Sequence, residues 1–135
     1  MDFEAFLKEF DQREINEWLG IRLIEYSPDY GRICLTKTDK TPQGIGGSVH
    51  GGVLATMADV VMLVAVFSNM KEGAEPAGTA DLNITYLRPA HGEKIYADAR
   101  VIKRGRQLAT VEVDITDDEG RLCAKSRLLY AFRAA

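Results

Sequence analysis

The chain has 135 residues, of which 46% are hydrophobic and 27% are charged. This length fits a single domain, residues 1–135, with a core of ordinary size, and the composition is that of a globular protein. The formal net charge of −3 gives no general attraction to nucleic acid or to acidic membranes, so an anionic ligand must be bound by a local basic cluster.

Targeting and metal signals are weak in this sequence. The sequence contains no basic N-terminal segment followed by an apolar run, so no signal peptide is visible. The longest apolar run is too short to span a bilayer. Cys34 and Cys123 could form one disulfide, but free buried thiols in a reducing cytoplasm are favoured. Two histidines and two scattered cysteines cannot build a convincing zinc site. We therefore expect a cytoplasmic protein with no metal and no membrane partner.

The first half of the chain predicts a short helix, two strands and one long helix. Four apolar residues at helical spacing follow Asp2, a good N-cap residue: Phe3, Phe6, Leu7 and Phe10. Residues 21–26 and 32–38 are typical of strands around a turn at residues 28–31. Residues 41–49 form a glycine-rich loop. Residues 51–69 are almost wholly apolar, which predicts a buried helix.

The second half of the chain predicts four strands. Alternation of apolar and polar residues indicates strands at residues 79–88, 94–103, 107–116 and 122–132. We interpret these four as an antiparallel meander, with Pro89 ending the first. A curved antiparallel sheet wrapped around the one long helix is the simplest way to bury that helix in so small a chain. The predicted fold class is α+β.

One segment combines two features that suit catalysis. Glycine-rich residues 47–52 run directly into the buried helix, whose first N–H groups are unpaired and lie at the positive end of its dipole. Such a helix start suits an anion or a developing oxyanion. Further along the helix, Asp59 is a lone carboxylate, which is costly to bury unless it is paired, hydrated or used. The segment thus offers an oxyanion site and a candidate base.

Three segments resemble the PaaI-type acyl-CoA thioesterases, a hot-dog fold family within the 4-hydroxybenzoyl-CoA thioesterase superfamily. They are residues 47–52 with Asp59 nine residues after His50, residues 79–90 ending in Leu-Arg-Pro-Ala, and residues 103–106 at a strand turn. The resemblance covers about residues 19–132, and the order of elements matches throughout. It implies a hot-dog fold and hydrolysis of acyl-CoA thioesters.

The resemblance also implies roles for individual residues. Asp59 is expected to act as general base or nucleophile, the backbone N–H of Gly51 to polarise the thioester carbonyl, and Thr79 to help position water. His50 either touches the substrate or only fixes the turn. A basic group is expected near the phosphates of coenzyme A: Arg104, Gly105 and Arg106, with Lys103 and Arg88 as helpers.

The resemblance further implies an assembly and a substrate. The active site is expected between two subunits, in a homodimer or homotetramer, with Asp59 of one chain facing the His50–Gly51 turn of the other. Coenzyme A is expected as part of the substrate, and no separate cofactor is expected.

The sequence departs from the family at one position. Many members carry Asn or Gln six residues before the histidine, where this chain has Gly44. Gln43 lies one residue too early, and the glycine-rich run of residues 44–47 can absorb a shift of one residue that lets Gln43 reach the site. Without that shift, one polar group that orients substrate or water is missing.

Other functions remain open from the sequence. A non-catalytic acyl-CoA-binding module is one alternative, and the Gly44 departure favours it. A hydratase or dehydratase of the same fold would pair a histidine with an acid across the site, whereas His50 lies in the glycine turn. A purely structural oligomer is a third alternative, against which the ionisable Asp59 in a buried helix argues. The sequence does not identify the acyl group.

Overall fold

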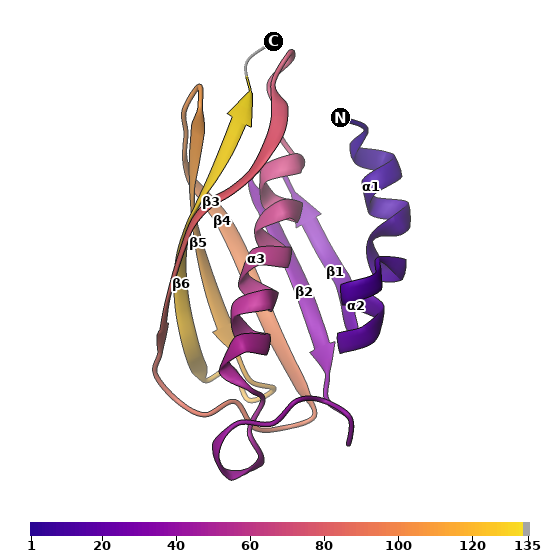
Figure 1. Ribbon diagram of the computed structural model, residues 1–135, viewed down its shortest axis with the longest axis vertical. Helices are drawn as coiled ribbons and strands as arrows, with labels where there is room; N and C mark the ends of the chain where they lie inside the picture. The colour runs from indigo at the N-terminus through magenta and orange to yellow at the C-terminus, as the bar shows by residue number, and fades with distance from the viewer. Residues whose placement is uncertain (134–135) are drawn as a thin grey trace.

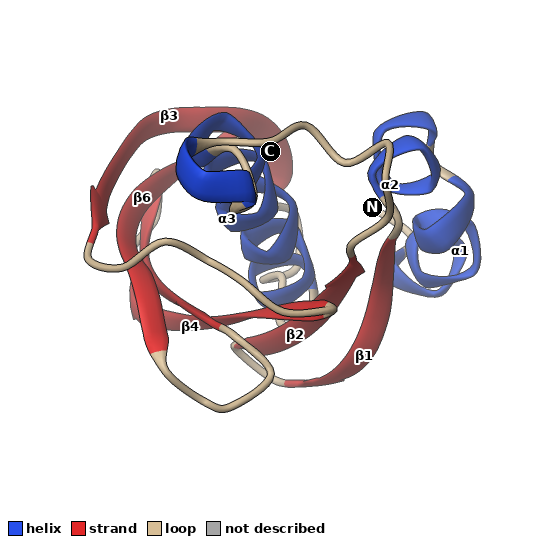
Figure 2. Ribbon diagram, turned by 90° about the horizontal axis from the view of Figure 1, so that it is seen from below, coloured by secondary structure: helices blue, strands red, loops and turns tan. Residues whose placement is uncertain are grey.

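One curved antiparallel sheet surrounds a single long helix in the computed structural model, which describes residues 1–133 (Figures 1 and 2). The helix is α3, Gly51–Phe67. The strands are β1 Ile21–Ser27, β2 Tyr30–Thr36, β3 Glu75–Tyr86, β4 Lys94–Arg104, β5 Leu108–Thr116 and β6 Leu122–Arg133. The six strands lie in the order β1-β2-β4-β5-β6-β3. This architecture confirms the hot-dog fold that the resemblance implies.

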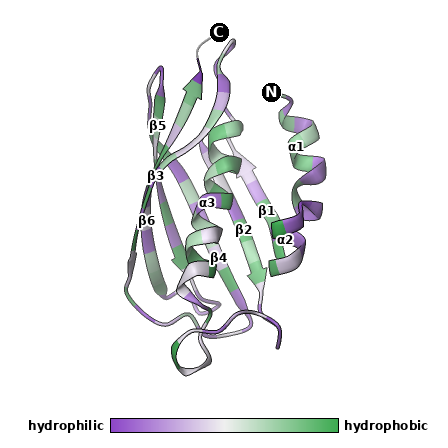
Figure 3. Cartoon of the chain, viewed as in Figure 1, coloured by the Kyte–Doolittle hydropathy of each residue, from purple (hydrophilic) through white to green (hydrophobic). Residues whose placement is uncertain are grey.

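Helix α3 forms the centre of the core because nearly all of its residues are apolar. Met57, Val61 and Val64 are fully buried against the inner faces of the strands. Each large side chain buried in this way contributes about 1.5–3 kcal/mol. Figure 3 shows the helix as mainly hydrophobic along its length. In its last turn, the carbonyl oxygen of Ala65 accepts a hydrogen bond from the Ser68 hydroxyl at 2.7 Å. The helix ends at Phe67, two residues before the predicted boundary.

The N-terminal segment contains more helix than the sequence predicts. Helix α1 (Phe3–Glu9) begins as expected, because the Asp2 carboxylate accepts from the Ala5 N–H at 3.1 Å. A short 3-10 turn, η1 (Phe10–Gln12), follows, and a second helix, α2 (Glu14–Leu19), was not predicted. These helices lie beside β1 (Figure 2). The ring of Phe6 packs edge-on against Phe67 at 5.1 Å, so α1 covers the end of α3.

The prediction that the last four strands form a meander is wrong for β3, the first of the four. Strands β4, β5 and β6 do form a meander, but β3 pairs with β6 and not with β4. The free edge of β4 is occupied by β2 instead. The reason is that α3 crosses the concave face of the sheet after β2, so the chain emerges at the far side and adds β3 to the opposite edge (Figure 1). Alternation along a strand indicates its two faces and carries no information about its neighbours.

Strand β3 forms one edge of the sheet, and most of its side chains are exposed. It begins four residues earlier than predicted, and its pairing with β6 is interrupted at two irregular positions, one between Thr79 and Asp81. Its outer edge pairs with no other strand in residues 1–133. Unpaired edges of this length are normally covered or paired in native proteins.

Both cysteines are buried and free, as the sequence favours. Burial raises the pKa of the Cys34 thiol and of the Cys123 thiol, so both stay protonated near neutrality. In the part of the chain that the structure describes, no helix is long and apolar enough to cross a membrane.

Candidate active site

Asp59 and Thr79, which the sequence selects from separate segments, are in direct contact. The Thr79 hydroxyl donates to Asp59 Oδ1 at 2.6 Å. Asp59 projects from the middle of α3 and is half-buried, while Thr79 is exposed on the edge strand β3. A short hydrogen bond to a carboxylate is of the charge-assisted kind and fixes the orientation of the acceptor. The acid therefore has a defined rotamer at the open edge of the sheet.

Tyr130 forms the inner wall beside this pair, and the sequence did not single it out. It lies on β6 directly opposite Thr79 and is only 4% exposed. Burial, and then the negative charge of Asp59, raise the pKa of Tyr130. Its ring packs edge-on against Phe67 at 5.6 Å. The Asp59 carboxylate thus lies at the border between an aromatic wall and the exposed edge strand.

The start of α3 is capped by the ring of His50. His50 Nδ1 accepts from the Gly52 N–H at 2.9 Å, and the His50 carbonyl accepts from the Val53 N–H at 2.9 Å. The Gly51 N–H has no acceptor among residues 1–133. Because this N–H belongs to the first turn of a 17-residue helix, the helix dipole favours an anionic acceptor there. The geometry leaves this donor open to an external oxygen.

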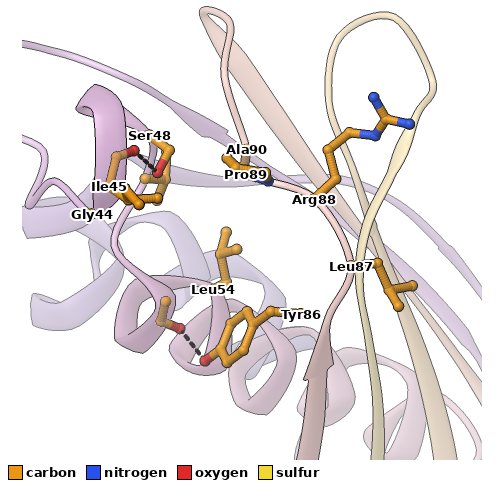
Figure 4. Close-up of a pocket in the computed structure, with 11 residues that line it drawn as sticks. Gly44, Ile45, Ser48, Leu54, Tyr86, Leu87, Arg88, Pro89 and Ala90 are labelled. Atoms are coloured by element: carbon orange, nitrogen blue, oxygen red, sulfur yellow. Dashed lines mark hydrogen bonds between the residues drawn. The ribbon is translucent and has the colours of Figure 1, made fainter.

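A cavity of about 320 Å³ lies next to this turn (Figure 4). Its wall is mainly apolar and comes from the glycine-rich loop, α3 and the segment after β3: Gly44, Ile45, Ser48, Val49, Gly51, Leu54, Tyr86, Leu87, Arg88, Pro89 and Ala90. The Tyr86 hydroxyl donates to the Gly51 carbonyl at 2.6 Å across this wall. In Figure 4 the Arg88 side chain extends away from Tyr86 and Leu54. Arg88 is therefore at the rim of the cavity and not inside it.

The glycine-rich loop contains two backbone conformations that favour glycine. Gly46 and Gly47 adopt left-handed φ values of 61° and 78°, which residues with a Cβ rarely adopt. The Gly44 N–H donates to the Ser48 carbonyl at 2.7 Å and closes the loop. Gln43 pairs through its backbone with Val49 and is exposed. A role for the Gln43 side chain in the site stays a prediction.

Arg104 and Arg106, both expected near the phosphates of coenzyme A, occupy different environments. The Arg104 side chain is only 10% exposed, and its Nη2 donates to Asp29 Oδ1 at 2.8 Å and to the Val66 carbonyl at 3.0 Å. The Arg104 guanidinium is therefore bound by α3 and the β1–β2 turn, and a role for Arg104 at the phosphates stays a prediction. Gly105 closes the hairpin by donating its N–H to the Leu108 carbonyl at 2.8 Å. Arg106 is exposed, as is Lys103.

Within one chain the glycine turn, Asp59 and the basic hairpin lie at different levels along α3. Gly51 and Asp59 are separated by about 12 Å of helix axis, and Val66, which contacts Arg104, lies about 22 Å from Gly51. The hairpin and the glycine turn are at opposite ends of the molecule (Figure 1). A single chain therefore separates the oxyanion donor, the acid and the basic hairpin. In residues 1–133, no group of three His, Cys, Asp or Glu side chains is placed to hold a metal ion.

Comparisons with known proteins agree with the observed fold. The family model of the thioesterase superfamily matches residues 46–124. Acyl-coenzyme A thioesterase 13 of Homo sapiens is 37% identical over 119 residues, which cover 85% of this chain and 82% of that protein. A medium/long-chain acyl-CoA thioesterase of Escherichia coli is 27% identical over 128 residues, covering 85% of this chain and 83% of that protein. The crystal structure of a thioesterase from Haemophilus influenzae superposes with a TM-score of 0.84 at 26% identity, covering 99% of this chain and 92% of that one.

Proposed function

Because this chain belongs to the thioesterase superfamily and is a thioester hydrolase, we propose that it hydrolyses thioesters of coenzyme A to a free acid and coenzyme A. The observation that carries the proposal is the hydrogen bond from Thr79 to Asp59, which holds a carboxylate at the exposed edge of the sheet. The names of the two curated relatives above support coenzyme A as the thiol part of the substrate.

The Gly51 N–H is the proposed oxyanion donor. The carbonyl oxygen of the thioester accepts from this N–H, and the interaction strengthens as negative charge develops on the oxygen. One such donor is worth about 3 kcal/mol in a dry site. The donor needs no rearrangement, because the cap formed by His50 already fixes the turn.

Asp59 is the proposed base or nucleophile. As base, it takes a proton from water while the water oxygen attacks the carbonyl carbon; the tetrahedral intermediate then collapses, the C–S bond breaks, and the proton passes to the departing thiolate. As nucleophile, its carboxylate attacks the same carbon and expels the thiolate, and water hydrolyses the resulting anhydride. A thiolate is a good leaving group, so neither route needs a strong general acid. Thr79 orients the carboxylate in both.

We propose that each site is shared by two chains. The separation of Gly51 and Asp59 along α3 is too long for one thioester carbonyl to meet both. Antiparallel pairing of two β3 edges would place two α3 helices side by side in opposite directions, so that Asp59 of one chain faces Gly51 of its partner. The unpaired edge of β3 supports this arrangement. We propose a homodimer as the minimal unit, with further pairing into a homotetramer.

Arg106, Lys103 and Arg88 are the proposed contacts of the coenzyme A phosphates. All three are exposed, whereas Arg104 is held by Asp29 and Val66. Exposed cations suit a flexible, highly charged nucleotide, because they bind it without the cost of burying charge. We further propose a cytoplasmic location, which the two free buried thiols support, and no resident cofactor.

The proposal is tested by release of free thiol from a panel of acyl-CoA thioesters. Wild-type protein should release thiol, and Asp59→Asn should lower kcat by about 10²- to 10⁴-fold with a much smaller change in KM, as expected for loss of a positioned proton acceptor. The matched control is Asp39→Asn, which makes the same change at an exposed loop carboxyl and should leave turnover unchanged.

Three outcomes would contradict the proposal. Binding of acyl-CoA without turnover by wild-type protein would indicate a binding module. Full turnover by Asp59→Asn would show that another group is the base. Crotonyl-CoA belongs in the panel, because hydration of its double bond without thiol release would indicate a hydratase of the same fold.

A further inference from the structure

Tyr86, the last residue of β3, makes two contacts with the first residue of α3 (Figure 4). Its hydroxyl donates to the Gly51 carbonyl at 2.6 Å. Its ring is so close that a Cβ at position 51 would lie 3.1 Å from the ring carbon Cζ and 3.2 Å from the hydroxyl oxygen. A Cβ at position 51 would therefore require the phenol to shift by a few tenths of an ångström.

The peptide between Gly51 and Gly52 is held at both ends. Tyr86 donates to its carbonyl, and its N–H donates to His50 Nδ1 at 2.9 Å. A hydrogen bond to the carbonyl of a peptide polarises that peptide and strengthens the bond made by its N–H. The phenol, the peptide and the imidazole thus form one chain of hydrogen bonds that fixes the plane of this peptide.

The Gly51–Gly52 peptide constrains the direction of the Gly51 N–H only through the backbone angles of Gly51. That N–H belongs to the preceding peptide, whose carbonyl, on His50, is held by the N–H groups of Val53 and Leu54 at 2.9 Å and 3.2 Å. The two peptide planes are joined only by the φ and ψ angles of Gly51, which is the residue type with the widest conformational freedom. With both planes fixed, these two angles can no longer vary freely.

We propose that Tyr86 is a positioning residue for thioester hydrolysis, which acts through the Gly51–Gly52 peptide to aim the Gly51 N–H at the thioester carbonyl. The inference rests on the proposed function of Gly51 as the oxyanion donor. An oxyanion donor accelerates a reaction only as far as it is oriented before charge develops, because reorientation during the reaction costs part of the stabilisation. Tyr86 touches the backbone of the turn and supplies this orientation from a different element.

The kinetic test is Tyr86→Phe, which keeps the ring and removes only the hydroxyl. Loss of one hydrogen bond that orients the donor should lower kcat by about five- to tenfold, while KM should stay within about twofold because ground-state binding does not use the oriented donor. Tyr26→Phe is the matched control, since Tyr26 is 49% exposed against 50% for Tyr86 and lies at β1. A Tyr86→Phe variant with wild-type kcat, or one changed only in KM, would overturn the inference.

A second measurement does not depend on turnover. In ¹⁵N-labelled protein, Tyr86→Phe should shift the amide resonances of Gly51 and Gly52, whereas Tyr26→Phe should leave both in place. Unchanged glycine resonances in Tyr86→Phe would refute the hydrogen-bonded chain itself. If wild-type protein released no thiol from any acyl-CoA, the proposed function would fail. The amide resonances of Gly51 and Gly52 would still test the hydrogen bonds that join Tyr86, the Gly51–Gly52 peptide and His50.

Discussion

A single hydroxyl group sets the orientation of the candidate base. Thr79 donates to Asp59 from the edge strand. Thr79→Val keeps the shape of the side chain and removes the donor, and a hydrogen bond to a charged group is worth about 1.5–3 kcal/mol. We therefore expect kcat to fall by at least about tenfold with KM little changed. Steady-state thiol release measures both constants.

Thr79→Ser is the internal control for that prediction. Serine retains the hydroxyl and should restore most of the lost turnover. Equal losses in the valine and serine variants would mean that the methyl group of Thr79, and not its hydroxyl, matters to the site.

Residue by residue, the sequence located the polar parts of the site better than its aromatic parts. The glycine turn with His50 and the lone carboxylate Asp59 are local signals, because each is unusual within its own segment. Tyr86 carries no such signal: its partner Gly51 is 35 residues away, and alternation only placed it with the apolar residues of its strand. Tyr130 was missed for the same reason. Contacts between elements require the fold before they can be seen.

At the scale of elements, Arg104 joins β4 to the end of α3 and to the β1–β2 turn. Its guanidinium bonds both the Val66 carbonyl and Asp29, which has a left-handed φ of 66°. Arg104→Ala leaves these acceptors without their charged donor, so it should lower the free energy of unfolding by about 1.5–3 kcal/mol. Urea denaturation followed by circular dichroism measures the change.

Arg106→Ala is the comparison for that variant, because Arg106 is exposed in the same hairpin. It should leave the unfolding free energy nearly unchanged and raise KM for acyl-CoA about threefold, with the effect shrinking at high salt. A KM effect of the same size for a thioester that lacks the nucleotide would show that Arg106 does not contact the phosphates.

The β5–β6 turn is built around the buried carboxylate of Asp117. Burial acts to raise the pKa of Asp117, but hydrogen bonds from Arg121 and from the Glu119 N–H outweigh it and lower the pKa below 3.8. The unfolded chain therefore binds this proton more readily than the folded protein does. The stability that Asp117 provides is fully present above pH 3.8 and is lost as the pH falls through the lower, folded pKa.

Acid denaturation tests this turn. Asp117→Asn should be less stable than wild type at neutral pH, and the difference between the two should shrink on acidification below about pH 4. A difference that stayed constant down to acid pH would mean that the charge of Asp117 does not stabilise the turn.

The sequence predicted most elements from periodicity, and its errors have local causes. Helix α2 has only six residues, which is too short for a 3.6-residue period to be recognised. It is separated from the preceding turn by Arg13, whose backbone is extended with ψ of 138°. Strand β3 begins before the predicted Thr79 because alternation is interrupted by the irregular pairing near Gly78. Periodic signals fail where the structure itself departs from regularity.

At the scale of the whole molecule, a site shared by two chains predicts that two inactive variants can restore activity in a mixed dimer. Asp59→Asn removes the base. Gly51→Val adds a side chain whose Cβ would lie 3.1 Å from the Tyr86 ring, so we expect it to displace the ring and disturb the oxyanion turn. Each variant alone should be inactive. In a mixed dimer, one site carries both changes and the other carries neither, so isolated mixed dimers should regain about half of wild-type activity and an unseparated random mixture about a quarter.

Co-expression of the two variants with different affinity tags isolates the mixed dimers. Thiol release by this fraction measures complementation, and co-expressed Asp59→Asn with Asp59→Asn provides the baseline. No recovery in a stable mixed dimer would place Asp59 and Gly51 of one chain in the same site. A stable monomer in sedimentation experiments would contradict both the assembly and the shared site.

The strand order also has a consequence for synthesis. Strand β3 leaves the ribosome before β4 and β5, yet the strand that it pairs with is β6, which is made after all of them. Until β6 has emerged, β3 and its residue Thr79 have no strand of their own chain to pair with. The outer β3 edge that we propose as the contact with the partner chain has therefore not yet formed. Long-range pairing of this kind forms late, after local contacts. We therefore expect two chains to join through the β3 edge of a complete sheet only after β6 of each chain has emerged and paired.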